Sequence, residues 1–297
     1  SGDGREWRQA RQVPTRATLT RVTRHRQRLW AVGHDATILS SIDGGETWNQ
    51  QHSDPEGDDL DPGVQGPLLD VLFVNPNDGF AIGAYGRFMT TSDGGINWNV
   101  ERMSDRVTSE AIDWQAMAAE QGGYETLPDD FNMGEADDPL AELDRGCYDF
   151  EECHLNDIME FDENRLMIAA ERGYGYRSED RGQTWEAFRF PYSGSMFGLV
   201  RQGDCIVAFG LRGHIQRSCD FGDSWTEMVT DGEQTLLGGE VTEDGRAILV
   251  GSGATRVTLH PDGRMEWDAD RLGSDYAAVA LGNGMQILVG ENGVRYD

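Results

Sequence analysis

An eight-residue motif, with Asp at its third position and Trp at its eighth, recurs along this 297-residue chain and constrains its fold more than any other feature. Four near-complete copies occupy residues 41–48, 91–98, 178–185 and 218–225, and a weaker fifth lies at 260–267. Asp and Gly favour a tight turn in which the carboxylate accepts backbone N–H groups, and the Trp packs behind that turn. We therefore interpret the motif Asp and Trp residues as structural. They are Asp43, Trp48, Asp93, Trp98, Asp180, Trp185, Asp220 and Trp225.

Short apolar segments surround each motif at regular spacing. A second and a third strand precede the motif across a hairpin, as at 29–32 and 37–41. A first strand comes before each hairpin, at 18–23, 69–74, 156–161, 196–201, 236–241 and 276–281. A unit of about 40 residues with four antiparallel strands is one propeller blade. The pattern predicts one all-β domain over 1–297, a β-propeller of six blades. Seven blades are the alternative if the acidic insertion conceals one.

The last unit stops after its third strand, while the chain has a spare strand at its other end. Residues 5–9 resemble the strand that begins at each motif Trp. We expect this N-terminal strand to complete the C-terminal blade. That pairing would close the ring and remove both exposed sheet edges.

The motif and the Gly-x-x-Gly hairpin before it resemble BNR/Asp-box propellers. The blades at 80–98 and 29–48 are similar to those of the photosystem II stability/assembly factor family and its relatives in non-photosynthetic bacteria. The resemblance covers the chain apart from two insertions, and the best-known family members have seven blades. It implies an exported protein that binds membrane-protein subunits and does not catalyse a reaction. The motif indicates architecture more than function, because exported sialidases, other glycosidases and sorting receptors share it.

Charge and hydropathy exclude two classes of function. The formal net charge is -28, which disfavours nonspecific binding to nucleic acid. No apolar run approaches the roughly 18 residues of a membrane-spanning helix. The charge is uneven, because residues 5–28 hold eight Arg and one acid, whereas residues 104–163 hold nineteen acids and two Arg. The basic segment 16–28 could dock an acidic partner or lipid headgroups.

Two long connections join a fourth strand to the next first strand, at 51–67 and 103–154, and should emerge on one face of the ring. The second is acidic, with helix-like stretches at 109–121 and 140–144. Connections of this length are usually functional or disordered. Five acids between Asp54 and Asp61 could surround Ca²⁺, although we favour a solvated loop and expect no metal and no cofactor.

The hairpin loops between second and third strands should share the face of these insertions. Their polar residues would ring the channel mouth, and three of them, Arg87, Arg172 and Arg212, could hold an anion. Sialidases use an arginine triad with Tyr and carboxylates, but the chain lacks their Arg-Ile-Pro motif, because Arg11-Gln12-Val13-Pro14 does not match. The candidate binding residues are His34, Asp35, Tyr85, Arg87, Glu171, Arg172, Tyr174, Arg212, His214, Glu291 and Asn292.

Arg21 falls on an innermost strand, and a charge there needs a partner. We align it with Val71, Ile158, Gly198, Gly239 and Ala278. Asp157 and Glu160 are the candidate partners.

The four cysteines form two predicted pairs. Cys205 and Cys219 should lie opposite each other across one hairpin, and Cys147 and Cys153 could staple the insertion. Disulfides persist in oxidising compartments. We therefore expect an exported, monomeric, non-catalytic scaffold, periplasmic or extracellular, that docks a protein partner through the insertion-bearing face. The partner could belong to a membrane or envelope complex. A sialidase-like or other glycoside hydrolase is the alternative.

Overall fold

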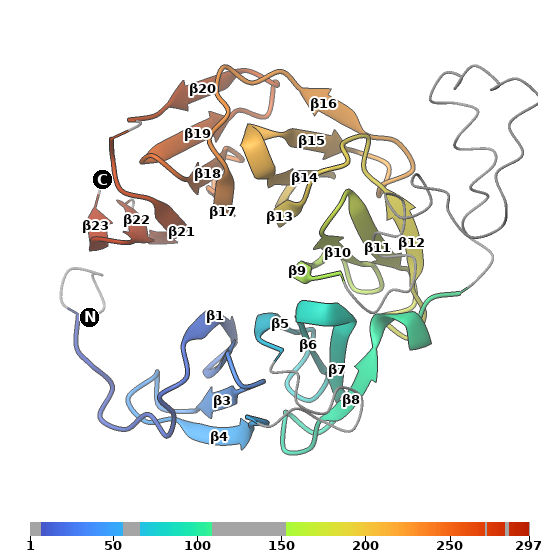
Figure 1. Ribbon diagram of the computed structural model, residues 1–297, viewed down its shortest axis with the longest axis vertical. Helices are drawn as coiled ribbons and strands as arrows, with labels where there is room; N and C mark the ends of the chain where they lie inside the picture. Colours follow the sequence, from blue (N-terminus) through green and yellow to red (C-terminus); the bar gives the residue numbers. More distant parts are fainter. Residues whose placement is uncertain (1–6, 56–65, 109–152, 271, 283–284, 297) are drawn as a thin grey trace, which may run out of the picture.

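The computed structural model describes residues 7–55, 66–108, 153–270, 272–282 and 285–296. Its strands form six antiparallel sheets arranged in a ring, which is a six-bladed β-propeller (Figure 1). In every blade the strands pair in sequence order, and the first strand lies innermost, beside the first strands of the neighbouring blades. Among the described residues, five blades have four strands and the sixth has three.

The strand bounds follow the repeat. Blade 1 contains β1 (Leu19–His25), β2 (Arg28–Gly33), β3 (Ile38–Ser41) and β4 (Asn49–His52). Blade 2 contains β5 (Leu68–Phe73), β6 (Gly79–Gly83), β7 (Arg87–Thr91) and β8 (Asn99–Arg102). Blade 3 contains β9 (Leu155–Glu160), β10 (Leu166–Ala170), β11 (Tyr174–Ser178) and β12 (Glu186–Arg189).

The second half continues the same order. Blade 4 contains β13 (Met196–Gln202), β14 (Cys205–Gly210), β15 (Ile215–Ser218) and β16 (Thr226–Met228). Blade 5 contains β17 (Leu236–Val241), β18 (Ala247–Gly251), β19 (Thr255–Leu259) and β20 (Met265–Asp268). Blade 6 contains β21 (Tyr276–Gly282), β22 (Met285–Gly290) and β23 (Gly293–Tyr296). Three short 3₁₀ turns, η1 (Ala84–Gly86), η2 (Met103–Asp105) and η3 (Leu211–Gly213), complete the described elements.

The hydrophobic core is divided among the junctions between blades. Each of the five consecutive junctions holds one cluster of buried side chains. At the first junction Trp30 of β2 stacks on Phe73 of β5 with ring centroids 3.6 Å apart. Burial of such aromatic faces holds neighbouring sheets together. In the described residues no such cluster joins blade 6 to blade 1, where Val22 is 58% exposed.

The motif turns are structural, as predicted. In the first copy Asp43 accepts the Thr47 backbone N–H at 3.0 Å and the Thr47 hydroxyl at 2.6 Å, and Ser41 donates to the same carboxylate at 2.8 Å. The other three near-complete copies repeat these bonds. Donors from Thr47 and Ser41 lower the pKa of Asp43 to about 2. These aspartates are therefore ionised and fully used by the turn.

Each innermost strand contains a β-bulge near its start, and the pairing beyond the bulge defines the position of Arg21 in the other blades. Arg21 pairs with Val32, and Asp70 and Asp157 occupy the same register position in blades 2 and 3. The positions in blades 4 to 6 are Gly198, Gly238 and Ala278. The alignment with Gly198 and Ala278 was therefore correct, and the alignment with Val71, Ile158 and Gly239 was wrong by one residue, which exchanges the two faces of a strand.

Arg21 lies between two buried carboxylates. Its Nη2 is 2.7 Å from Asp157 Oδ1, and its Nε is 3.0 Å from Asp70 Oδ1. Asp157, rather than Glu160, is thus the predicted partner, and Asp70 is a second one. Asp70 also accepts the Ile158 N–H of blade 3, and Asp157 accepts the Leu199 N–H of blade 4, both at 2.9 Å. This carboxylate–guanidinium cluster joins four consecutive blades.

The ring junction between blades 6 and 1 differs from the predicted closure. The last sheet contains β21, β22 and β23 only, and residues Trp7 to Gln9 are not in a strand. The indole of Trp7 nevertheless donates to the Tyr296 hydroxyl on β23. Further along, the Arg11 N–H donates to the Glu46 carbonyl at 2.8 Å. The N-terminal segment therefore runs from blade 6 to blade 1, as closure requires, without the predicted sheet pairing in its described part.

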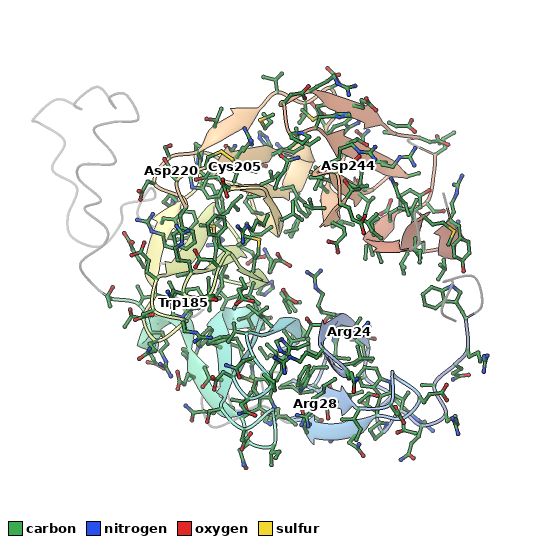
Figure 2. All side chains as sticks on the ribbon, turned by 180° about the vertical axis from the view of Figure 1, so that it is seen from behind. Arg24, Arg28, Trp185, Cys205, Asp220 and Asp244 are labelled. Carbon is green, nitrogen blue, oxygen red and sulfur yellow. A yellow bond between two sulfur atoms is a disulfide. The ribbon has the colours of Figure 1, made fainter. Side chains whose placement is uncertain are left out.

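The cysteine prediction is confirmed for blade 4, where Cys205 and Cys219 form a disulfide across the β14–β15 hairpin (Figure 2). Cys153 is also disulfide-bonded, and its predicted partner Cys147 lies outside the described residues. The helix-like segments at 109–121 and 140–144 lie outside them too. Within the described ranges no helix has the length and apolar character needed to span a bilayer.

Candidate functional site

The hairpin tips between second and third strands form the candidate site. Five of them hold non-glycine residues in the left-handed region, with φ of 57° at Asp35, 58° at Tyr85, 56° at Arg172, 55° at Arg212 and 48° at Ala254. L-residues rarely adopt this conformation, which costs roughly 1–2 kcal/mol each. The tight hairpins impose it and hold these side chains at the ends of the blades.

The two long connections meet the same tips. The Asp54 N–H donates to the Asp35 carbonyl at 2.8 Å, and the Ala84 N–H donates to the Pro67 carbonyl at 2.9 Å. For the second connection, the Gly86 N–H donates to the Cys153 carbonyl at 2.8 Å. The described flanks of both connections therefore lie on the face that carries the tips, as the topology predicted.

A first polar cluster lies between the tips of blades 2 and 3. The Tyr85 ring meets the His154 ring edge to face, with centroids 5.2 Å apart. His154 Nδ1 is 3.3 Å from Glu171 Oε1, and its backbone N–H donates to Glu171 Oε2 at 3.1 Å. Burial opposes ionisation of Glu171, but the bonds from His154 outweigh it and lower the pKa of Glu171. Glu171 is therefore a carboxylate oriented by a histidine.

A second cluster lies at the tip of blade 4. The His214 ring stacks on Tyr192 with centroids 3.6 Å apart, and His214 Nδ1 is 2.6 Å from Glu227 Oε1. Partial burial raises the pKa of Tyr192, and the charge of the neighbouring Arg212 opposes this rise. The two clusters share one composition, an aromatic ring, a histidine and a carboxylate, on neighbouring parts of the ring.

Two predicted site residues are buried instead. Arg87 is 5% exposed and Tyr174 is 1% exposed, with the Arg189 guanidinium 4.2 Å from the Tyr174 ring centroid. Each is the first residue of a third strand, where the strand turns its side chain inward. Of the three predicted arginines, only Arg172 and Arg212 lie at tips. The structure therefore does not bring Arg87 to the surface beside them.

The remaining predicted residues lie at the tips of blades 1 and 6. The His34 N–H donates to the Thr18 carbonyl at 2.9 Å, and the Glu291 N–H donates to the Asp275 carbonyl at 3.2 Å. Asn292 donates to Ser274 and lines a pocket of about 350 Å³ between blades 5 and 6.

Sequence reasoning missed His154, Tyr192 and Glu227. His154 comes from a long connection, Tyr192 from the link between blades 3 and 4, and Glu227 from the outermost strand β16. None belongs to a hairpin tip, so the repeat gives no signal for them. A search for His and Tyr beside the tips could have found the first two.

The basic segment is partly committed to structure. Arg21 belongs to the carboxylate–guanidinium cluster, and Arg28 Nη1 donates to the Gly94 carbonyl of blade 2 at 3.1 Å. Arg24 donates to the Arg26 carbonyl at 2.5 Å. Figure 2 places Arg24 and Arg28 on blade 1. Of the arginines at 16–28, these three are used within the fold, so the segment is a weaker docking candidate than the tips.

The described ranges contain no group of three His, Cys, Asp or Glu residues that could hold a metal ion. Of the acidic loop considered for Ca²⁺, only Asp54 falls within them.

No protein-family model matches the chain, and no curated protein matches it either. Solved structures do resemble it. A structure described as YCF48 bound to D1 peptide has a TM-score of 0.64 and 19% identity, over 100% of this chain and 84% of the other. YCF48 from Cyanidioschyzon merolae has a TM-score of 0.60 and 16% identity, over 94% of this chain and 82% of the other. An ancestral GH74 enzyme has a TM-score of 0.61 and 10% identity, over 95% of this chain but only 38% of that enzyme. At these identities the similarity shows the propeller fold.

Proposed function

We propose that this protein is a non-catalytic, exported binding scaffold that docks a protein partner through the hairpin-tip face. The observation that carries the proposal is the left-handed backbone at Tyr85, Arg172 and Arg212. Glycine would relieve this strain, yet large polar side chains occupy the positions. Backbone strain is found at binding and catalytic sites, and at these tips it coincides with large polar side chains on one face, which favours a functional role for them.

The surrounding chemistry supports a protein partner. Exposed Arg and Tyr are among the residue types enriched at protein interfaces, and both long connections reach this face. The structural resemblance adds to this, because one of the similar structures is YCF48 bound to D1 peptide, a peptide ligand on a propeller. The Cys205–Cys219 disulfide supports an oxidising location. We propose that the partner belongs to an envelope or membrane complex.

Site-specific crosslinking tests which face binds. Benzoylphenylalanine at Tyr85 would report on the tip face, and the same group at Ile42, 73% exposed in the motif turn of blade 1, would report on the opposite face of the ring. We expect one discrete crosslinked partner from the Tyr85 position in native envelope extract and none from Ile42. Equal crosslinking at both positions, or crosslinking from Ile42 alone, would contradict the proposal.

Paired substitutions separate binding from stability. Arg212→Gly should stabilise the fold by about 0.5–1 kcal/mol, because glycine accepts the left-handed backbone at no steric cost. It should also weaken partner capture at least as much as Arg212→Ala, which keeps the strain. Hydrolysis of fluorogenic glycosides by the unmodified protein, lost in Glu171→Gln, would instead support the glycoside hydrolase alternative.

A further inference from the structure

The motif turns bridge neighbouring blades through one recurring contact. At the junction of blades 1 and 2, Arg28 Nη1 donates to the Gly94 carbonyl at 3.1 Å, and its guanidinium lies 5.5 Å from the Trp30 ring centroid. At the junction of blades 3 and 4, Arg177 Nη1 donates to the Phe221 carbonyl at 3.3 Å. Gly94 and Phe221 both follow the motif Asp. An arginine from the preceding blade thus binds the same turn carbonyl at both junctions.

The junction of blades 2 and 3 lacks this arginine. The equivalent carbonyl belongs to Arg181, and no donor to it is found in the described part of the chain. Asp78 occupies the position of Arg28. Arg28 lies five residues before Gly33, which pairs with the first residue of β1, and Asp78 lies five residues before Gly83, which pairs with the first residue of β5. Thr90 occupies the position of Arg177, directly before the motif. Blade 2 therefore offers a carboxylate and a short hydroxyl where its neighbours have guanidinium groups.

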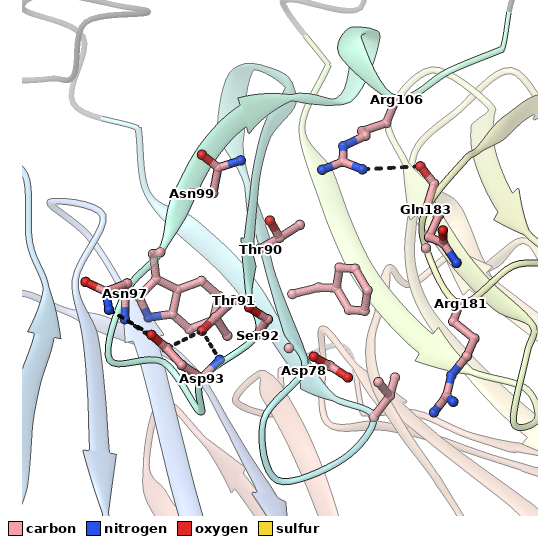
Figure 3. Close-up of a pocket in the computed structure, with 15 residues that line it drawn as sticks. Asp78, Thr90, Thr91, Ser92, Asp93, Asn97, Asn99, Arg106, Arg181 and Gln183 are labelled. Carbon is pink, nitrogen blue, oxygen red and sulfur yellow. Dashed lines mark hydrogen bonds between the residues drawn. The ribbon is translucent and has the colours of Figure 1, made fainter.

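A pocket of about 730 Å³ lies at this place. Figure 3 shows Asp78 and Thr90 on blade 2 facing Arg106, Arg181 and Gln183 on the other side. Phe80, which holds the position of Trp30 in blade 2, lines the pocket as well. The pocket thus brings together the Arg181 residue, the Asp78 carboxylate and the Phe80 ring. The Arg181 carbonyl and the Phe80 ring are the equivalents of the carbonyl and the ring that Arg28 contacts at the preceding junction.

We propose that this pocket receives an arginine side chain from a basic segment of a partner protein. The guanidinium would donate to the Arg181 carbonyl and the Asp78 carboxylate and lie against Phe80. Asp78 keeps acceptor capacity, since only its Oδ2 is used, by Asn75 Nδ2 at 2.7 Å. Arginine suits the site better than lysine, because its planar fork can reach two acceptors and stack on a ring.

Of the two cations at the rim, Arg106 already has a counter-ion, and nearby carboxylates disfavour an anion. Arg106 is neutralised by Glu101, with Nη2 2.8 Å from Oε1, and its Nη1 donates to the Gln183 carbonyl at 3.3 Å. An anion would also lie beside the Asp78 and Asp93 carboxylates. The net charge of -28 favours approach of a basic partner.

This site is separate from the proposed tip face. Strand β7 runs from the Tyr85 tip at one end to the motif turn after Thr91 at the other. The pocket lies at the motif end, so a partner could be held at both ends of blade 2. Failure of the tip-face proposal would leave this inference intact.

Three pentapeptides test the proposal: acetyl-Gly-Ser-Arg-Ser-Gly amide, its citrulline isostere and its lysine analogue. Titration at physiological salt, followed by amide chemical shifts, should place the arginine peptide at Thr90 and Gly182. Affinity should exceed that of the neutral citrulline peptide by about tenfold, as expected for hydrogen bonds to a charged group. Equal binding of the two, shifts confined to the hairpin tips, or no shift at 10 mM peptide (about the weakest binding of interest) would overturn it.

Two variants sharpen the test. Thr90→Arg supplies the arginine found at the same position in blade 3, so it should fill the pocket, raise the melting temperature and abolish peptide binding. Asp78→Asn should weaken binding about fivefold or more, by loss of the charge-assisted bond. Thr226→Arg and Asp204→Asn make the same charge changes at exposed positions and should leave binding unchanged. Undiminished binding by Thr90→Arg would refute the site.

Discussion

Replacing Arg21 with methionine should destabilise the ring, because it leaves two buried carboxylates facing each other without a counter-ion. The side chains of Asp70 and Asp157 are 4% and 5% exposed, and both contact the Arg21 guanidinium. Methionine preserves most of the side-chain volume and removes the charge. The variant therefore tests electrostatics at the junctions of blades 1, 2 and 3 with little change in packing.

The structure sets the size of the effect. Removing one partner of a buried ion pair costs about 3–5 kcal/mol. The Arg21 side chain is 44% exposed, so water replaces part of the lost interaction. Both carboxylates also keep a backbone N–H donor. We therefore expect a loss of about 2–3 kcal/mol, a fall of about 4–12 °C in melting temperature for a chain of this size.

The loss should grow with pH. Burial raises the pKa of Asp157 to about 8, against the opposing charge of Arg21 and with the support of Asp70. Because the folded value lies above the unfolded one, the bound proton contributes stability fully below about pH 4. That contribution is lost as pH rises through about 8. Arg21→Met removes the opposing charge and raises the pKa of Asp157 further, so the variant should suffer more at pH 9 than at pH 6.

Thermal and denaturant unfolding at pH 6 and pH 9 measure both effects. Asp157→Asn keeps an acceptor for the Leu199 N–H and removes one charge, so it should lose less stability than Arg21→Met at pH 9. Arg172→Met, at an exposed hairpin tip, is the matched control and should change little. An unchanged melting temperature in Arg21→Met, or a larger loss at pH 6 than at pH 9, would refute the reasoning.

Three further predictions concern the frame of the propeller. The pKa of Asp93 is lowered to about 2 by the Asn97 donors, so its contribution to stability should be present above about pH 4 and lost as pH falls through about 2. Asp93→Asn should reduce this loss of stability at low pH in unfolding curves, and Asp204→Asn should not. Thiol titration of denatured, unreduced protein should find no free thiol, and Cys205→Ala with Cys219→Ala should cost about 2–4 kcal/mol; titratable thiols in the unreduced sample would exclude the bridges. Deleting residues 1–9 should lower the melting temperature and promote association through the β23 edge, whereas an unchanged sedimentation profile and melting curve would show that the N-terminus does not protect that edge.

The blade positions were predictable because each motif marks one end of a third strand. The motif at 91–98 places β7 and β8, and the apolar segments before it place β5 and β6 within one or two residues. The disulfide of Cys205 followed from the same register, since its partner falls opposite it across the hairpin. Local turn chemistry and alternation contain this information, so no tertiary contact is needed to read it.

The errors arose where side-chain direction depends on a single residue of register. Arg21 was aligned one residue away from Asp70 and Asp157, and in a strand one residue separates one face from the other. Arg87 and Tyr174 directly follow hairpin tips and were placed at the surface, yet strand alternation turns them inward. His154 and Tyr192 come from links between blades, and only the ring geometry brings them beside the tips.

The two ends of each blade differ in how their polar side chains are used, and this difference indicates where a partner would bind. At the motif end the aspartate of each near-complete motif accepts internal donors, and the low pKa of Asp43 shows how strongly its charge is engaged. Substitutions there act first on the fold. At the hairpin end, the turns hold the side chains of Tyr85 and Arg212 at the ends of their blades. The junction of blades 2 and 3 breaks this division, because Asp78 and Thr90 replace the arginines that bind the equivalent turn carbonyl at the junctions on either side. A turn carbonyl that lacks its internal arginine there is open to one supplied by another protein.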